Sequence, residues 1–155
     1  MIQIPFFKIS INPLKSVYIR VIIKNMSLLY EEESYKIRGC CFKVFNSLGG
    51  NIKEKIIEKA LLSELKIQGF LVENQVQIDI IYNNEKIGTY IPDIIINNKI
   101  IIELKSKPFI TKEDEKQFWG YLKGSQYKYK LGFLINFGSQ KLTIKRFIYT
   151  NKKSV

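Results

Sequence analysis

The stretch that decides the fold reads YIPDIIINNKIIIELK and runs from residue 90 to residue 105. It contains two isoleucine-rich runs on either side of Asn97 and Asn98. Runs of β-branched residues joined by a short asparagine turn predict a β-hairpin. Uninterrupted apolar runs of this kind are typical of strands buried on both faces. We therefore expect two adjacent strands in the interior of a sheet.

Three charged residues, Asp93, Glu103 and Lys105, lie within this hairpin. Because residues two apart on a strand share a face, Glu103 and Lys105 point the same way, and Asp93 can face Glu103 across the hairpin. Charges at the ends of buried strands are costly unless they are paired or bind a metal. Two carboxylates and an ammonium can hold a divalent cation beside an activated water, as in phosphodiester cleavage. The alternative is a surface hairpin in which Lys105 pairs with one of the carboxylates.

The pattern of an acidic residue, any residue and a lysine occurs three times, so the pattern alone is weak evidence. The copies at 64–66 and 114–116 fall in helical patterns, where residues two apart point in different directions. Only the copy at 103–105 falls in a predicted strand, and it follows the one Pro-Asp pair of the chain. Its placement distinguishes it from the other two.

Composition limits the chemistry available to the chain. At 155 residues and 46% hydrophobic content it fits one globular domain. The absence of histidine excludes histidine-based triads and histidine-metal motifs, and the adjacent Cys40 and Cys41 cannot form a zinc quartet. The net charge of +11 suits a polyanionic partner, although a solvated lysine-rich surface explains it equally well. No run approaches the ~20 apolar residues of a membrane span, and we expect a cytoplasmic protein.

The periodicity of apolar residues predicts the order α-α-β-β-β-α-β-β. We expect residues 1–25 to form an N-terminal extension, with Met26 as an alternative start, residues 26–150 to form the domain and residues 151–155 to form a tail. The predicted helices span residues 31–48, 52–68 and 111–125, with Thr111 as an N-cap, and the predicted strands span residues 70–82, 87–96, 100–105, 131–137 and 142–149.

This order, with the acidic hairpin at its centre, resembles the PD-(D/E)XK nuclease superfamily and, more narrowly, the GxxExxY proteins. The resemblance implies an α/β fold with a mixed sheet: a restriction-endonuclease-like α-β-β-β-α-β core with an extra N-terminal helix and a C-terminal strand. It covers residues 28–148 and is carried by the segments 39–44, 48–54, 58–61, 64–65, 69–70, 88–93, 102–105, 117–122 and 132–138.

The chain departs from the narrower pattern at three positions. The glycine that gives the GxxExxY motif its name corresponds to Asn51, and the tyrosine corresponds to Ile57, so that only Glu54 of the motif is retained. A histidine that these proteins often carry on the later helix corresponds to Asp114. The central Asp93, Glu103 and Lys105 are all present.

The resemblance assigns roles in a metal-dependent reaction. Asp93, Glu103 and the Leu104 carbonyl would bind Mg²⁺ or Mn²⁺, and Lys105 would orient or deprotonate the attacking water and offset charge on the phosphate. Glu54 would lean toward the metal, or would only complement the dipole of its helix.

On the later helix, Gln117 and Tyr121 share a face and would lie near the scissile phosphate, unless Tyr121 is an ordinary packing aromatic.

Basic residues near the end of the chain are candidates for contact with a phosphate backbone, although a solvated basic face is an equal alternative. These are Lys123, Lys141, Lys145 and Arg146, with Lys128 and Lys130 nearby. The leading hypothesis is thus a metal-dependent nuclease acting on DNA. The alternative is a nucleic-acid-binding or assembly module that keeps the fold with little or no catalysis.

Overall fold

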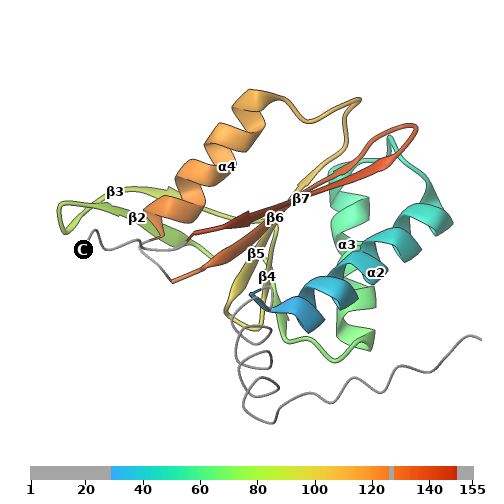
Figure 1. Cartoon of the computed structure of the whole chain (residues 1–155), viewed down its shortest axis with the longest axis horizontal. Helices are drawn as coiled ribbons and strands as arrows, with labels where there is room; N and C mark the ends of the chain where they lie inside the picture. Colours follow the sequence, from blue (N-terminus) through green and yellow to red (C-terminus); the bar gives the residue numbers. More distant parts are fainter. Residues whose placement is uncertain (1–28, 126–127, 150–155) are drawn as a thin grey trace, which may run out of the picture. The chain divides into compact units, whose positions relative to one another are not determined.

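The computed structural model describes residues 29–125 and 128–149 (Figure 1). The expected N-terminal extension, the alternative start at Met26 and the tail at 151–155 lie outside these residues. The chain divides into two units, residues 1–31 and 32–155, and the helices and strands described below belong to the second apart from the first residue of the first helix. Within the described ranges, no helix combines the length and apolar character needed to cross a membrane.

The second unit has a mixed α/β fold built on one central sheet. Five strands form it in the order β1-β4-β5-β6-β7, and β2 and β3 form a separate two-stranded sheet. This arrangement agrees with the fold class expected from the sequence. The elements are α2 (Glu31–Leu48), α3 (Glu54–Ile67), β1 (Val72–Glu73), β2 (Ile78–Tyr82), β3 (Glu85–Tyr90), β4 (Ile94–Ile96), β5 (Ile100–Lys105), α4 (Lys112–Gly124), β6 (Leu131–Phe137) and β7 (Leu142–Ile148).

The predicted hairpin is formed by β4 and β5 in the interior of the sheet. The two strands pair antiparallel, with Ile94 opposite Ile102. Three residues connect the strands, and the Lys99 N–H donates to the Ile96 carbonyl at 2.9 Å. The two central residues of this turn, Asn97 and Asn98, adopt positive φ values of 51° and 52°, which asparagine tolerates. One step beyond the paired residues, this register brings Asp93 opposite Glu103.

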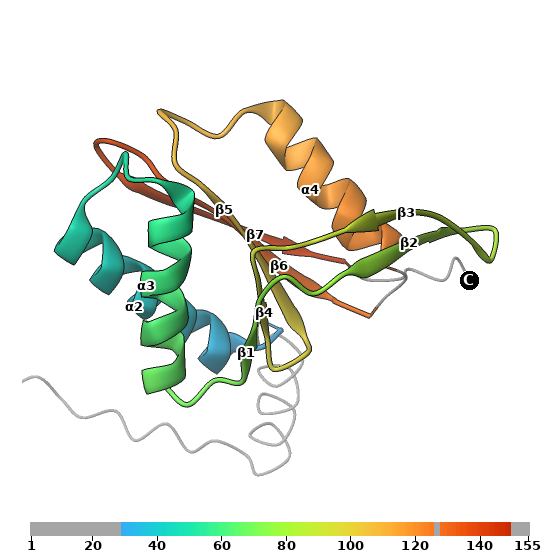
Figure 2. The same ribbon diagram turned by 180° about the vertical axis from the view of Figure 1, so that it is seen from behind.

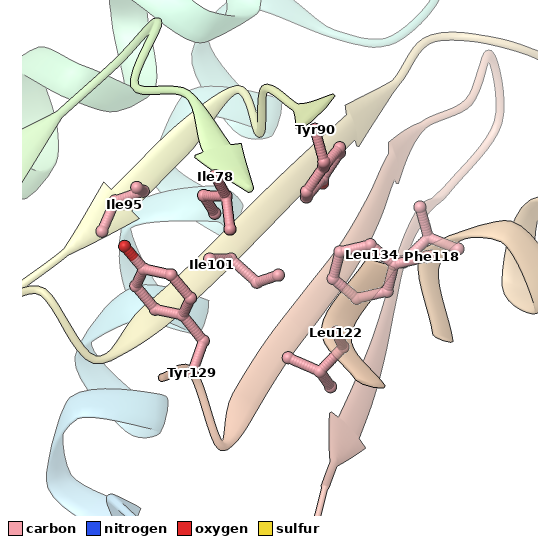
Figure 3. Packing of buried hydrophobic residues seen from close by; sticks show 8 residues of the cluster. All are labelled: Ile78, Tyr90, Ile95, Ile101, Phe118, Leu122, Tyr129 and Leu134. Carbon is pink, nitrogen blue, oxygen red and sulfur yellow. The ribbon is translucent and has the colours of Figure 1, made fainter. Parts of the chain in front are cut away.

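Helices cover both faces of the sheet (Figure 1, Figure 2). On one face, α4 packs over a cluster that includes Ile95 of β4 and Ile101 of β5 (Figure 3). The alternate residues of the same strands point to the opposite face, which α2 and α3 cover, and Phe45 of α2 contacts Phe137 of β6 there. The full α4-side cluster comprises Ile78, Tyr90, Ile95, Ile101, Phe118, Leu122, Tyr129 and Leu134.

The connection between β5 and β6 places α4 over the face of the sheet to which the charged residues point. These strands are parallel, so α4 crosses over one face of the sheet between them. Thr111 caps α4 through a capping box with Asp114, which confirms the predicted N-cap. Glu103 and Lys105 share the strand face of Ile101, and they therefore point to the side of the sheet that α4 covers.

Two strand predictions were wrong because each merged two strands. The predicted strand at 70–82 is divided into β1 and β2, which belong to different sheets, and Gln75 between them has a φ of 60°. The predicted strand at 87–96 is divided into β3 and β4 at the segment 91–93. Pro92 in this segment has no N–H for the ladder. Within residues 29–125 and 128–149 the order is therefore α-α-β-β-β-β-β-α-β-β.

A close backbone contact fixes where α3 begins. A Cβ added at Gly50 would lie 1.7 Å from the carbonyl oxygen of Gly138, so only glycine fits. The neighbouring Asn51 N–H donates to the Phe137 carbonyl at 3.0 Å. The loop before α3 is thereby held against the end of β6, beside the end of β5.

Gly50→Ala should destabilise the domain because the backbone at Gly138 has no room to yield. We expect a loss of about 3 kcal/mol in the free energy of unfolding, measured by urea titration. Gly39→Ala is the matched control, since Gly39 lies within α2 with open space around its Cα, and it should leave stability unchanged or raise it. Equal stability of the two variants would contradict this account of the loop.

Candidate functional site

Asp93 is held at the end of the hairpin by the backbone of the neighbouring strand. It follows Pro92 and directly precedes β4. Its Oδ2 accepts a hydrogen bond from the Leu104 N–H at 2.6 Å. Since Leu104 lies between Glu103 and Lys105 on β5, this bond fixes the Asp93 carboxylate beside both of them.

Glu103 and Lys105 contact each other and are mostly shielded from solvent. The Lys105 Nζ lies 2.9 Å from the Glu103 Oε1, and the two side chains are 22% and 18% exposed. The other oxygen, Oε2, accepts a hydrogen bond from the hydroxyl of Tyr90 at 2.6 Å. Both oxygens of the Glu103 carboxylate therefore have partners.

The pKa shifts of Asp93 and Lys105 reflect the negative charge gathered around them. Burial raises the pKa of Asp93 to about 6, with further increases from the charges of Glu103 and Glu58, against the opposing effects of the Leu104 N–H and Lys105. For Lys105, burial lowers the pKa, but the bond to Glu103 and the charges of Glu54 and Asp93 outweigh it, so that the net shift is upward. The site therefore favours positive charge, and Lys105 is an ammonium at neutral pH.

Helix α3, on the opposite face of the sheet, contributes two glutamates near the strand ends that carry the site. Glu54, its first residue, accepts a hydrogen bond through Oε1 from the Ser106 N–H at 3.0 Å, directly after Lys105. Glu58, one turn later, is only 6% exposed and is bonded to Lys55 and Asn74. Sequence reasoning singled out Glu54 but missed Glu58, which the i, i+4 spacing from Glu54 could have revealed.

Helix α4 brings two of the predicted residues to the same cluster. The Gln117 Nε2 donates to the Tyr121 hydroxyl at 3.1 Å, so both lie on one helix face as expected. The Tyr121 ring stacks on Tyr90, with ring centroids 4.0 Å apart and an interplanar angle of 11°. Tyr90 was also missed, because a tyrosine inside a predicted strand carries no sequence signal for a carboxylate partner.

The predicted basic residues do not form one continuous strip. Lys145 is paired with Glu115 of α4, while Arg146, its neighbour on β7, points to the opposite face of the sheet. Lys123 is exposed and lines a groove between α4 and the β2–β3 hairpin, and Lys141 is exposed just before β7. Lys123 and Lys141 are the more accessible of the four.

The donor set fits a hard divalent cation that keeps most of its waters. Within residues 29–125 and 128–149, no three Asp, Glu, Cys or His side chains gather closely enough to form a metal cage. Mg²⁺ needs only one or two carboxylates, which Asp93 and Glu103 can supply. Asp114 is not available, because Thr111 and Lys107 engage it; burial raises its pKa, but these bonds outweigh burial and lower the pKa to about 2.

Comparison with known proteins agrees with this geometry. The model of a family described as PD-(D/E)XK nuclease superfamily matches residues 31–147. The chain belongs to the PD-(D/E)XK nuclease superfamily. Searches of curated proteins and of solved structures gave no match.

Asp93→Asn tests the crowding of charge without any need for catalysis. The folded-state pKa of about 6 lies above the usual 3.8, so the folded state binds the proton more tightly than the unfolded state does. Stability should therefore fall as pH rises from about 4 through 6. In EDTA, Asp93→Asn should be more stable than wild type at pH 7.5 by about 1–2 kcal/mol, and the difference should shrink toward pH 4.

Urea unfolding of both proteins at pH 4, 5, 6 and 7.5 measures this difference. A difference independent of pH would show that Asp93 titrates normally. A large loss of stability in the variant at every pH would favour a purely structural salt bridge.

Proposed function

We propose that this protein is a divalent-metal-dependent nuclease that hydrolyses phosphodiester bonds in DNA. The supporting observation is the hydrogen bond from the Leu104 N–H to Asp93, which joins both carboxylates and Lys105 in one site of a nuclease-superfamily chain. When bound, Mg²⁺ or Mn²⁺ would polarise the phosphate and lower the pKa of a bound water. Asp93, Glu103 and the Leu104 carbonyl are its proposed ligands.

Each remaining residue has a role suited to its position. Lys105 orients or deprotonates the attacking water and offsets charge on the phosphate. Glu54 accepts from the backbone after Lys105 and holds the end of β5, while its charge faces the Lys105 ammonium. Gln117 and Tyr121 offer polar groups on the α4 face toward the scissile phosphate.

We include membership of the GxxExxY group in this proposal. At two of the three positions where the chain departs from the motif, the residue present suits the local structure. Asn51 has a φ of 60°, a conformation that favours glycine and that asparagine accepts better than most residues. Ile57 is fully buried and so contributes packing at the tyrosine position. Neither change removes one of the three central charged residues, Asp93, Glu103 and Lys105. Their presence favours an active enzyme over the binding-module alternative.

The proposed nucleic-acid contacts use the exposed lysines. Lys123 and Lys141 have the solvent access that phosphate contact requires, whereas Lys145 would first have to leave Glu115. Backbone contacts of this type give affinity without sequence preference and weaken with salt.

Lys105→Ala separates chemistry from binding. Because Lys105 acts in the transition state, the variant should lower the single-turnover cleavage rate by about 10²-fold or more while changing DNA affinity little. The measurement is cleavage of labelled single-stranded, duplex and flap DNA with Mg²⁺ and Mn²⁺, beside affinity as a function of salt.

The matched variant is Lys123→Ala combined with Lys141→Ala, which should do the reverse. It should weaken binding and reduce the salt slope by roughly one counterion per lost phosphate contact. Wild-type cleavage by Lys105→Ala would remove Lys105 from the mechanism. DNA binding by the wild type without cleavage under any of these conditions would favour the binding module.

A further inference from the structure

Tyr90 is a buried tyrosine whose hydroxyl points at a proposed metal ligand. It ends β3 and is only 5% exposed, within the cluster beneath α4 (Figure 3). A buried tyrosine hydroxyl needs a hydrogen-bond partner, and here the partner is the Glu103 Oε2 at 2.6 Å. A hydroxyl-to-carboxylate bond of this length is charge-assisted and stronger than a neutral one.

The Tyr90 ring is held in place from α4. Tyr121 stacks on it at 4.0 Å, and Gln117 in turn donates to the Tyr121 hydroxyl. Phe118 and Leu134 belong to the same buried cluster. The Tyr90 ring is therefore held by packing from α4 as well as by its hydroxyl bond to Glu103.

Tyr90 can act in this bond only as the donor. The Glu103 carboxylate oxygen accepts hydrogen bonds, and the Tyr90 hydroxyl, 2.6 Å away, carries the hydrogen that is donated. The two oxygens of Glu103 thus have different partners: Oε2 accepts from Tyr90, and Oε1 accepts from the Lys105 ammonium at 2.9 Å.

We propose that Tyr90 is a positioning residue that fixes Glu103 so that it offers a single oxygen, Oε1, to the divalent cation. The proposal rests on the proposed function. Coordination through one oxygen suits Mg²⁺, which demands near-octahedral geometry, whereas Ca²⁺ accepts carboxylates through one or both oxygens. Tyr90 thereby contributes to selection of Mg²⁺ over Ca²⁺ as well as to affinity.

Tyr90→Phe tests this directly, because it removes the hydroxyl and keeps the ring. Isothermal titration of the metal-free full chain with Mg²⁺, Mn²⁺ and Ca²⁺ should show the Kd for Mg²⁺ rising about 10-fold or more, as for other groups that orient metal ligands. The Kd for Ca²⁺ should change less, so that the preference for Mg²⁺ falls.

The matched control is Tyr129→Phe. Tyr129 is fully buried in the same cluster, and its hydroxyl donates to the Asn98 Oδ1 at 3.4 Å, away from Glu103. This variant should leave all three Kd values unchanged. Urea unfolding of both variants separates lost stability from lost metal binding.

Wild-type affinity and selectivity in a folded Tyr90→Phe protein would overturn the proposal. If that variant does not fold, Tyr121→Leu replaces it, because it removes the stacked ring and keeps both the Tyr90 hydroxyl and the Glu103 carboxylate. The same rise in the Kd for Mg²⁺ is expected, and an unchanged Kd would overturn the proposal. Wild-type metal binding with the expected change in the variant, but no cleavage of any DNA, would reject the nuclease and keep the role of Tyr90. A wild-type chain that binds none of the three ions would overturn both.

Discussion

The hydrogen bond from the Leu104 N–H to Asp93 is the interaction on which the site depends. Asp93 precedes β4, and Glu103 and Lys105 belong to β5, so the three residues meet only if these strands pair in one register. The register is determined by the asparagine turn and by isoleucines buried on both faces. A slip by one residue would exchange the faces of the strand and turn Glu103 toward α2 and α3.

This arrangement brings several negative charges together at a partly buried position. Asp93 has a raised pKa because burial and the carboxylates of Glu103 and Glu58 all disfavour its ionised form. Lys105 compensates for part of the negative charge through its contact with Glu103. A site with this excess of negative charge is suited to a cation. The fold holds the site in place by packing helices over both faces of the sheet. A hydrogen bond between the loop before α3 and the end of β6 contributes as well.

Much of the fold and the centre of the site could be predicted from the sequence. The hairpin, the helix capped by Thr111 and the strand face shared by Glu103 and Lys105 follow from local patterns with a clear period. The breaks in the two merged strands were harder to place, because the apolar pattern continues through a left-handed residue at Gln75 and through Pro92. The periodicity of apolar residues does not show where the chain passes from one sheet to another.

The parts of the site that escaped prediction depend on tertiary contacts. Tyr90 reaches Glu103 only because β3 ends beside β5, and Tyr121 meets Tyr90 only because α4 crosses that face. The pairing of Lys145 with Glu115 likewise depends on how α4 lies over β7. Sequence spacing locates residues along one element, whereas these partners come from elements far apart in the chain.

A crystal structure of the protein grown with Mn²⁺ would show whether Asp93 and Glu103 share one divalent cation. Anomalous scattering locates manganese independently of the protein model. We expect one peak with carboxylate oxygens of Asp93 and Glu103 each about 2.1 Å away, a typical bond length for a hard, six-coordinate cation, and with Lys105 directed into the same site. A peak elsewhere in the domain, or none at saturating Mn²⁺ while both carboxylates keep their present partners, would contradict it.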